Sequence, residues 1–388
     1  MNTRGPDPEL GLLLALGRSR LAADRAVALE ARLARPFDAP RLHRLAAEHG
    51  LMPLLYRHLV MERPDALPAE SAAAVAHEFR QHAISRWPMA RRLRELLQVL
   101  RDAGVTAMPY KGPALATQLF GNYAMRQYGD LDILVRPSQV SAAVERLQAH
   151  GLSAPHGVPA DWDGFVRRTR HDYAMRDRRT GTLVELHWGL TYRYQGFGVD
   201  PEWLLNDPVE VDYLGVRIAC MNPSAQLLAL AVHGVKHQWE RLGWLVDVAE
   251  LMSGHDPDWD WIDARARAIG FTRAWRSSLL LCDTMLGLPD TVPMSQARRD
   301  RPAARLARRL AREISRDDPR PIGFVTRLRF DLLARPGAAA KLVYLSRLLT
   351  LPSEADLAGR RVSTAWAATY AVTRPLRLLR KMRRQGRR

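Results

Sequence analysis

The sequence is poor in cysteine and in long apolar runs, and each scarcity excludes a class of protein. Its 388 residues include two cysteines, Cys220 and Cys282, which cannot build a disulfide framework and lack the spacing of a metal-binding motif. No stretch reaches the 18 or so apolar residues of a membrane span, and the apolar stretch near the N-terminus is too short for a secretory signal. We therefore expect a cytoplasmic protein that lies at most at the periphery of a membrane.

Acidic residues are also scarce relative to basic ones. The chain has 58 Lys and Arg against 41 Asp and Glu, a formal net charge of +17. Residues 374–388 contain seven Arg, one Lys and no acid, so this block alone carries +8 of that charge. With Leu376, Leu378 and Leu379 along one side, the block fits a short amphipathic helix that contacts RNA or an anionic membrane. The alternative is a solvated charge run without a partner.

The remaining composition is that of a folded globular protein. Hydrophobic residues make up 47% and charged residues 26%, which are ordinary values, and 388 residues exceed what one core usually serves. Along the chain, the spacing of apolar residues changes from helical to mixed helical and alternating, and then back to helical. We expect three parts: an N-terminal helical region at residues 1–95, an α+β core at 96–220, and a C-terminal helical region with the basic tail at 221–388.

The middle part alternates in a way that is typical of a compact α+β domain. In the N-terminal region, helical spacing favours helices at 10–33 and 85–103, and a run at 40–61 in which Gly50 ends one helix and Pro53 begins the next. In the core, the expected strands are 105–110, 131–135, 172–178, 182–188 and a pair within 209–219, with helices at 113–120 and 137–150. Residues 172–188 read as a hairpin around a turn that contains Gly181.

The most informative string is Gly-Asp-Leu-Asp-Ile-Leu-Val, which contains Asp130 and Asp132. Side chains two apart on a strand share a face, so both carboxylates point the same way while Leu131 and Ile133 enter the core. Two neighbouring carboxylates repel each other unless a cation lies between them, and oxygen ligands suit Mg²⁺. The competing explanation is an Asp-x-Asp that caps a turn or pairs with arginine.

A third carboxylate is available in Val-Glu-Leu-His-Trp, which places Glu185 and His187 on one face of a strand. If this strand lies beside residues 131–135, Glu185 lies next to the two aspartates. Three acids around two metal ions are the usual arrangement for in-line nucleotidyl transfer. We therefore predict Asp130, Asp132 and Glu185 as the catalytic metal ligands.

Phosphate-binding residues are expected just upstream. Lys111 precedes Gly112, which allows close backbone approach and opens a helix whose N–H groups can cradle phosphate. The Lys111 ammonium would offer a point charge to the phosphates, and the Arg126 guanidinium would offer a charged fork of hydrogen-bond donors.

A polar stripe follows in the third part, provided that one helix continues through it. Its members fall at spacings of 4, 3, 4 and 3, with Lys236 beside them: His233, His237, Glu240, Trp244 and Asp247. We expect Lys236 and His237 to reach a nucleotide phosphate from this stripe. Two alternatives remain open: a zinc site at the two histidines, although the glutamate of HExxH is missing, and a structural hydrogen-bonding stripe. His171 and His187 carry the same ambiguity.

Taken together, these motifs resemble a known family. The string KGPALATQLFGNYAMRQYGDLDILV, followed by VELHW, is similar to an uncharacterised bacterial nucleotidyltransferase-like family of the DNA polymerase β-like superfamily. The resemblance implies the polymerase-β-like α+β core. It assigns Lys111 and Gly112 to phosphate binding, Asp130 and Asp132 to the metal pair, and Glu185 to the third ligand. One departure is that Lys-Gly-Pro stands where the wider superfamily has Gly-Ser or Gly-Gly.

These observations predict an NTP-dependent nucleotidyltransferase that uses Mg²⁺, with Mn²⁺ as the alternative ion. It would move a nucleoside monophosphate from an NTP such as ATP to a hydroxyl on an RNA end, a protein or a small molecule. The rival class is a catalytically degenerate protein of the same fold that binds nucleotide, RNA or a membrane-associated partner. A degenerate chain would be expected to have lost one of the three acids, and all three are present.

Overall fold

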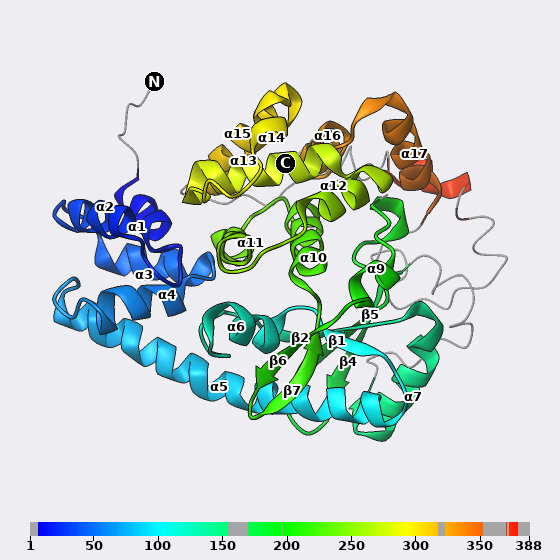
Figure 1. Cartoon of the computed structure of the whole chain (residues 1–388), viewed down its shortest axis with the longest axis horizontal. Coiled ribbons are helices and arrows are strands. Elements are labelled where there is room, and N and C mark those ends of the chain that lie inside the picture. The colour runs from blue at the N-terminus through cyan, green and yellow to red at the C-terminus, as the bar shows by residue number, and fades with distance from the viewer. Residues whose placement is uncertain are drawn as a thin grey trace.

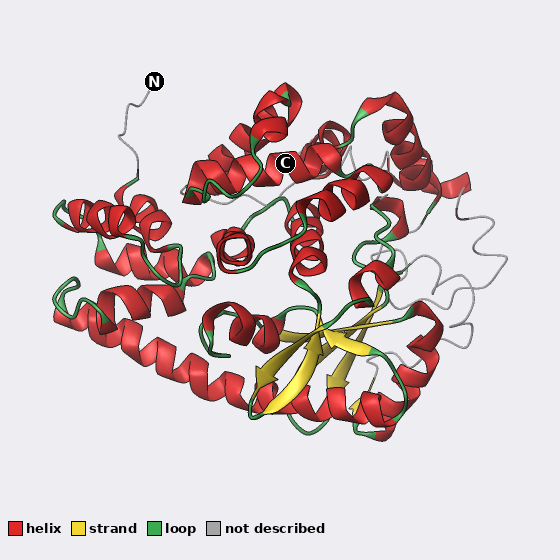
Figure 2. Cartoon of the chain, in the orientation of Figure 1, coloured by secondary structure: helices red, strands yellow, loops and turns green. Residues whose placement is uncertain are grey.

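We describe the protein from a computed structural model, which covers residues 7–153, 170–195, 197–316, 323–351, 370 and 372–378. The chain contains a five-stranded sheet, and Figure 1 shows the long helix α5 (Ala69–Asp102) running beneath the strands. The N-terminal helices lie at one end, and the C-terminal helices cover the opposite side of the sheet from α5. Helices dominate the described residues, and the strands gather in one place (Figure 2).

The N-terminal part is helical, and the predicted break near Gly50 and Pro53 is present between α3 and α4. Its elements before α5 are α1 (Pro8–Leu16), α2 (Ala23–Leu33), α3 (Ala39–Glu48), α4 (Met52–Tyr56) and the π-helical turn η1 (Arg57–Met61). The single helix expected at 10–33 is wrong, because the chain breaks after Leu16. A Cβ on Gly17 would lie 2.7 Å from Leu286, and Arg18 donates to the carbonyl of Ala249 at 2.6 Å. Contacts from the distant third part therefore end α1.

Helix α5 begins at Ala69, well before the predicted start at residue 85, and links the first two parts of the chain. Its second half, from Met89 to Leu100, packs into the core beneath the sheet. The three-part division stays a prediction.

The expected strands of the middle part are present in a mixed sheet of order β1-β2-β5-β4-β3. The strands are β1 (Ala107–Pro109), β2 (Asp130–Val135), β3 (Leu152–Ser153), β4 (Asp172–Asp177) and β5 (Leu183–His187). The central pair β2 and β5 is parallel, and the other pairs are antiparallel. Strands β6 (Val209–Tyr213) and β7 (Val216–Cys220) form a separate hairpin. The connecting elements are α6 (Gly112–Phe120), η2 (Pro137–Gln139), α7 (Val140–Ala149), η4 (Arg193–Gln195) and α9 (Pro201–Leu205).

The two faces of the sheet bury different cores. Leu131, Ile133, Val184 and Leu186 are fully buried with α5 and α7, as their alternation predicts. Leu134 on the opposite face joins a second core that the N-terminal and C-terminal helices share. Since Asp132 lies on that second face, its carboxylate points into the space between the sheet and the C-terminal helices.

The third part is helical, and its elements from residue 223 to residue 350 follow one another along the chain. They are α10 (Pro223–Lys236), α11 (Leu242–Gly254), α12 (Trp259–Ala268), α13 (Thr272–Leu286), α14 (Ser295–Arg299), α15 (Arg301–Ile314), α16 (Phe324–Ala334) and α17 (Gly337–Thr350). Helix α10 begins where the Asn222 side chain accepts from the N–H of Ala225, with Pro223 at the first helical position. Among the described helices, none has both the length and the apolar character of a bilayer span.

The basic tail falls partly outside the described residues. Residues 372–378 are helical, whereas residues 379–388, which carry most of the predicted charge block, are not described. Arg374 is not part of a solvated charge run, because it is 3% exposed and its Nε donates to the carbonyl of Leu348 at 2.7 Å.

Candidate active site

The pairing of β2 with β5 brings two of the predicted carboxylates side by side. In this parallel register Asp132 lies opposite Glu185, and Asp130 lies opposite Leu183. Residues opposite each other on neighbouring strands share a face, so Asp132 and Glu185 project together. Asp130 is two residues earlier on that face, at the start of β2, where it is half-buried.

The end of β1 is tied to both the sheet and α10, and this fixes the position of Lys111. The N–H of Tyr110 donates to the carbonyl of Asp132 at 3.0 Å. The Tyr110 hydroxyl donates to the carbonyl of Ala229 at 3.0 Å, and the Gln226 amide donates to the carbonyl of Tyr110 at 3.1 Å. Because these bonds clamp the strand, Lys111 emerges at a defined place beside Asp132.

Gly112 makes the turn from β1 into α6. Its φ is +64°, in the left-handed region that glycine adopts without strain. A Cβ there would lie 3.5 Å from the carbonyl of Asp130, which is ordinary contact. The backbone conformation, rather than a lack of space, therefore explains why glycine suits this position.

Two cationic side chains meet the buried carboxylate of Asp132, which is 2% exposed. Lys111 Nζ lies 3.1 Å from its Oδ1 atom, and His187 Nε2 lies 2.9 Å from the same oxygen. His187 Nε2 also lies 3.4 Å from Glu185 Oε2. Without a metal, these two side chains balance the charge of the acids.

The pKa values of this cluster follow from that arrangement. Burial alone would raise the pKa of Asp132, but the charge of Lys111 and the hydrogen bond from His187 outweigh it, and the pKa lies below its usual value. Burial would lower the pKa of His187, yet its hydrogen bonds to Asp132 and Glu185 raise that pKa to about 9. The hydrogen bond from His187 also lowers the pKa of Glu185.

Asp130 behaves differently. Burial and the charge of Asp132 raise the pKa of Asp130 to about 6, because Lys111 only partly offsets them. The metal-free site therefore holds one carboxyl whose charge is poorly compensated, and an additional cation would relieve this.

The donor set at this point fits a metal ion. One atom each from Asp132, Glu185 and His187 lie within 4.8 Å of one another, and this is the one such group of three or more potential ligands among the described residues. Nδ1 of His187 is buried and has no hydrogen-bond partner in the described part of the chain. Two carboxylates and an imidazole suit Mn²⁺ as well as Mg²⁺. Asp130 lies beside this group but does not belong to it.

Lys236 reaches the edge of the same cluster through His171. Its Nζ lies 3.0 Å from His171 Nε2, and the His171 ring lies 5.9 Å from the ring of His187. Burial and the neighbouring Lys236 charge lower the pKa of His171 well below its usual value, so the ring is neutral. The Lys236 ammonium therefore donates a hydrogen bond to Nε2 of His171, and the buried Nδ1 of His171 has no hydrogen-bond partner among the described residues.

The polar stripe is not on one continuous helix, which corrects the sequence-based expectation. Helix α10 ends at Lys236, and Gln238 and Trp239 turn the chain with φ of 55° and 56°. Trp239 is fully buried and fills the space over Gly234, where a Cβ would overlap its ring. This packing explains why the break comes before Gly243. Glu240 is exposed as a result.

Other members of the stripe still meet in space. The His233 ring lies 4.7 Å from that of His237 and 4.9 Å from that of Trp244, and 6.4 Å from Tyr110. Burial lowers the pKa of His237 to about 3. Neither histidine belongs to a group of three potential metal ligands within the described residues, which argues against the zinc alternative.

Arg126 is engaged elsewhere. Its Nε donates to both carboxylate oxygens of Asp247, at 2.9 and 3.1 Å, so this pair ties the segment before β2 to α11. The structure thus brings together Asp130, Asp132, Glu185, Lys111 and Gly112. Lys236 contacts this cluster only through His171. Arg126 and His237 lie in a neighbouring layer.

The sequence analysis left the role of His187 open and assigned none to Tyr110. The signal for His187 was present, because alternation puts it on the same face as Glu185. For Tyr110 no local signal exists, since its partners Gln226 and Ala229 are more than a hundred positions away.

The comparisons with known proteins agree with this geometry. A family model described as an uncharacterised nucleotidyltransferase matches residues 35–287, which includes the sheet, α10 and α11. No curated protein and no solved structure matches the chain significantly. The chain therefore belongs to this uncharacterised nucleotidyltransferase family.

Proposed function

We propose that the protein is a metal-dependent nucleotidyltransferase that moves a nucleoside monophosphate from an NTP to a hydroxyl acceptor. The observation that carries this proposal is the parallel register of β2 and β5, which sets Asp132 beside Glu185 within a group of potential metal ligands. Family membership supports the same reaction class.

In this proposal Asp132, Glu185 and Asp130 hold Mg²⁺ or Mn²⁺, and His187 is an additional ligand. When bound, the ion neutralises charge on the phosphates and on the leaving pyrophosphate. Lys111 is 3.1 Å from Asp132 without the ion, and it can turn from this carboxylate to a phosphate oxygen once another cation faces Asp132. Its position before the turn at Gly112 places that charge at the N-terminus of α6, where backbone N–H groups also favour phosphate.

The layer from α10 and α11 packs beside the site, against Tyr110 at the end of β1. Tyr110, His233 and Trp244 pack edge to face there, and the Arg126–Asp247 pair lies behind them. In this proposal the layer keeps water from the carboxylates and so strengthens their interactions with cations. Lys236 is the remaining basic group at the rim, and its contact with His171 orients it.

Transfer from an α-³²P-labelled NTP tests this proposal. The purified protein, Mg²⁺ or Mn²⁺ and each labelled NTP are incubated with a cell extract, and the expected result is a labelled product that is lost with EDTA and in Asp132→Asn. A γ-labelled NTP serves as the control and should release its label as pyrophosphate. Label that enters the product only from the γ-position would contradict nucleotidyl transfer.

One observation favours a second candidate, a degenerate protein that binds ligands without catalysis. Lys111 and His187 already neutralise Asp132, as in a site that has replaced its metal by an internal ion pair. Calorimetric titration with Mn²⁺ and NTP separates the two, because the degenerate protein should bind NTP equally well in EDTA.

A further inference from the structure

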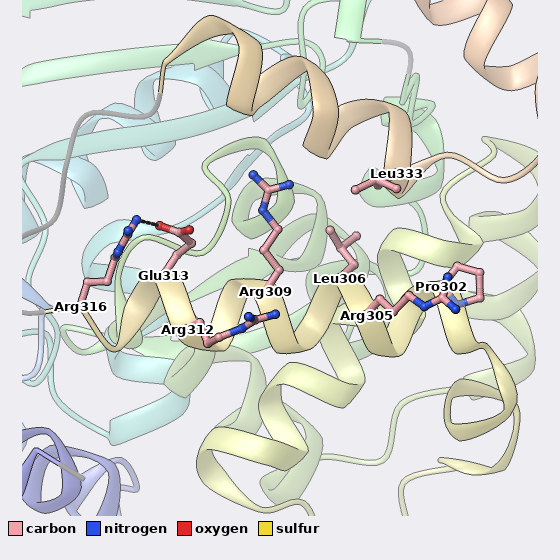
Figure 3. Close-up of a pocket in the computed structure, with 8 residues that line it drawn as sticks. All are labelled: Pro302, Arg305, Leu306, Arg309, Arg312, Glu313, Arg316 and Leu333. Carbon is pink, nitrogen blue, oxygen red and sulfur yellow. Dashed lines mark hydrogen bonds and ion pairs between the residues drawn. The ribbon is translucent and has the colours of Figure 1, made fainter. Parts of the chain in front are cut away.

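The described surface contains a strongly basic cavity that the proposed reaction does not yet use. It measures about 620 Å³ and lies between α15 and α16. Four of its eight lining residues are arginines at positions i, i+4, i+7 and i+11, of which the first three belong to α15 and the last lies just past its end: Arg305, Arg309, Arg312 and Arg316. Figure 3 shows them spread along the helix, with Leu333 of α16 across the cavity.

These arginines are largely uncompensated. Glu313 is the one acid in the lining, so the four arginines leave a charge of +3 (+4 − 1). Glu313 pairs with Arg316 at 2.6 Å, while Arg305 and Arg309 form no ion pair with any described residue. Three of the four guanidinium groups therefore have no ion pair with a described residue, and such groups in a concavity are suited to bind phosphates, because each offers a forked set of donors.

Cavities that share lining residues lie between this cavity and the layer beside the candidate active site. Arg309, Glu313 and Arg316 also line a second cavity of about 400 Å³, which extends to His49 and Arg241. His49 and Arg241 in turn line a small cavity that Arg126, Trp244 and Asp247 share. The Trp244 ring packs edge to face with His233, which in turn lies beside Tyr110 and Lys111. We name the two larger cavities together the α15 groove.

The shape and length of the α15 groove indicate which anion it fits. Seven residues of α-helix separate Arg305 from Arg312, which is about 10 Å at 1.5 Å per residue, and Arg316 extends the row just past the end of α15. This is long enough for several consecutive phosphates, whereas one nucleotide would need one or two of these side chains. A flat bilayer cannot enter a concavity of this kind. None of the eight residues lining the first cavity is aromatic, so base stacking does not contribute there.

We propose that the α15 groove binds the phosphodiester backbone of a single-stranded nucleic acid, independently of its sequence, and that this strand carries the acceptor hydroxyl. The role of the strand as acceptor rests on the proposed function, whereas the binding of the strand does not. The strand would lie along Arg305, Arg309, Arg312 and Arg316, and its end would point past Arg241 toward the carboxylates.

Salt-dependent binding tests the α15 groove without any catalysis. A fluorescein-labelled, unstructured 12-nucleotide RNA and the matching DNA are titrated with the full chain in EDTA and without NTP, and anisotropy is read between about 50 and 200 mM salt. Each phosphate contact on a single strand adds about −0.7 to the slope of log K against log salt. Four contacts therefore weaken binding about 50-fold over this range, in addition to any contribution of the basic tail.

The double variant Arg305→Gln/Arg309→Gln removes two contacts and should make the slope shallower by about 1.4. The matched control is Arg80→Gln/Arg91→Gln, which removes two exposed arginines of equal charge from α5, on the other side of the molecule. Its slope should equal that of the unchanged chain. Arg305→Lys/Arg309→Lys should keep the slope and shows that the loss is not a folding defect.

An equal slope for the Gln variant and its α5 control would overturn the proposal, as would binding to anionic phosphatidylserine vesicles without binding to either oligonucleotide. Comparison of the RNA with the DNA identifies the preferred strand. Binding with the expected slopes but no transfer to the strand would leave the α15 groove in place and contradict its role as the acceptor site. Transfer to another acceptor would confirm the enzyme and contradict only that role.

Discussion

Asp130 and Asp132 should respond oppositely to neutralisation in the metal-free protein, although both are proposed metal ligands. Asp130→Asn removes a charge that the fold does not compensate, because burial and Asp132 raise the pKa of Asp130 from 3.8 to about 6. About two pKa units correspond to about 3 kcal/mol. Since Asp130 is only half-buried, solvent screening reduces this, and we expect Asp130→Asn to stabilise the protein by about 1–2 kcal/mol at pH 7.5.

Asp132→Asn should do the reverse. It leaves His187, 3% exposed, and Lys111 without their shared carboxylate, and removing one partner of a buried ion pair costs about 3–5 kcal/mol. The Lys111 side chain is 12% exposed and can turn toward water, so the lower end of about 3 kcal/mol is expected.

Urea unfolding in EDTA, followed by tryptophan fluorescence, measures both changes. The sign of the pH dependence gives a second check. The folded pKa of Asp130 lies above the unfolded value, so the unchanged protein loses stability as pH rises from about 4 to 6. The advantage of Asp130→Asn should therefore be full above pH 6 and absent at pH 4. Shifts of the same sign for both variants would refute the electrostatic account of the site.

Three further predictions concern residues outside the carboxylate cluster. Gly234→Ala should destabilise the protein by about 1–3 kcal/mol despite alanine's helix propensity, because its Cβ overlaps Trp239. In the control Gly254→Ala in α11, the new Cβ meets nothing within 4 Å, so this variant should be neutral or stabilising in the same urea titration. Burial lowers the pKa of His237 to about 3, so protonation below about pH 6.5 favours the unfolded chain. His237→Gln should therefore reduce the loss of stability with falling pH by up to about 1.4 kcal/mol per pH unit. An unchanged dependence of stability on pH would mean that His237 is charged in the fold. Burial raises the pKa of Cys282 to about 12, so a thiol reagent should modify it no faster than the protein unfolds, and rapid modification under native conditions would contradict its burial.

Local patterns in the sequence predict much of the sheet. The alternation that puts Asp130 and Asp132 on one face, with Leu131 and Ile133 in the core, is present in β2. The hairpin around Gly181 is also present as β4 and β5. These features depend on side-chain period and turn residues, which a single sequence displays directly.

Pairings between distant segments are what the sequence does not display. Nothing local fixes the register that sets Asp132 opposite Glu185, and the alternation of each strand only makes it available. Arg126 was predicted to contact phosphate, but its partner Asp247 is 121 residues away. A tertiary contact of this kind sets the direction of a side chain, and the residues next to it in the sequence do not indicate the contact.

The break between α10 and α11 illustrates a different reason why the sequence did not predict part of the structure. Gln238 and Trp239 adopt positive φ, which helix propensity and hydrophobic period do not predict for such residues. The burial of the Trp239 ring over Gly234 compensates for this strain. The helical stripe that includes His233 and His237 was therefore predicted on one helix, although the residues come from two elements.

The most direct test of the central claim is to titrate the protein with Mn²⁺ and read free Mn²⁺ by electron paramagnetic resonance, with and without NTP. We predict saturable binding that Mg²⁺ displaces, NTP strengthens and Asp132→Asn abolishes, with Glu185→Gln and His187→Gln weakening it. The Arg80→Gln/Arg91→Gln protein should bind as the unchanged chain does. The account would be contradicted if the unchanged chain bound no Mn²⁺ in the presence of NTP, or if Asp132→Asn bound it equally well.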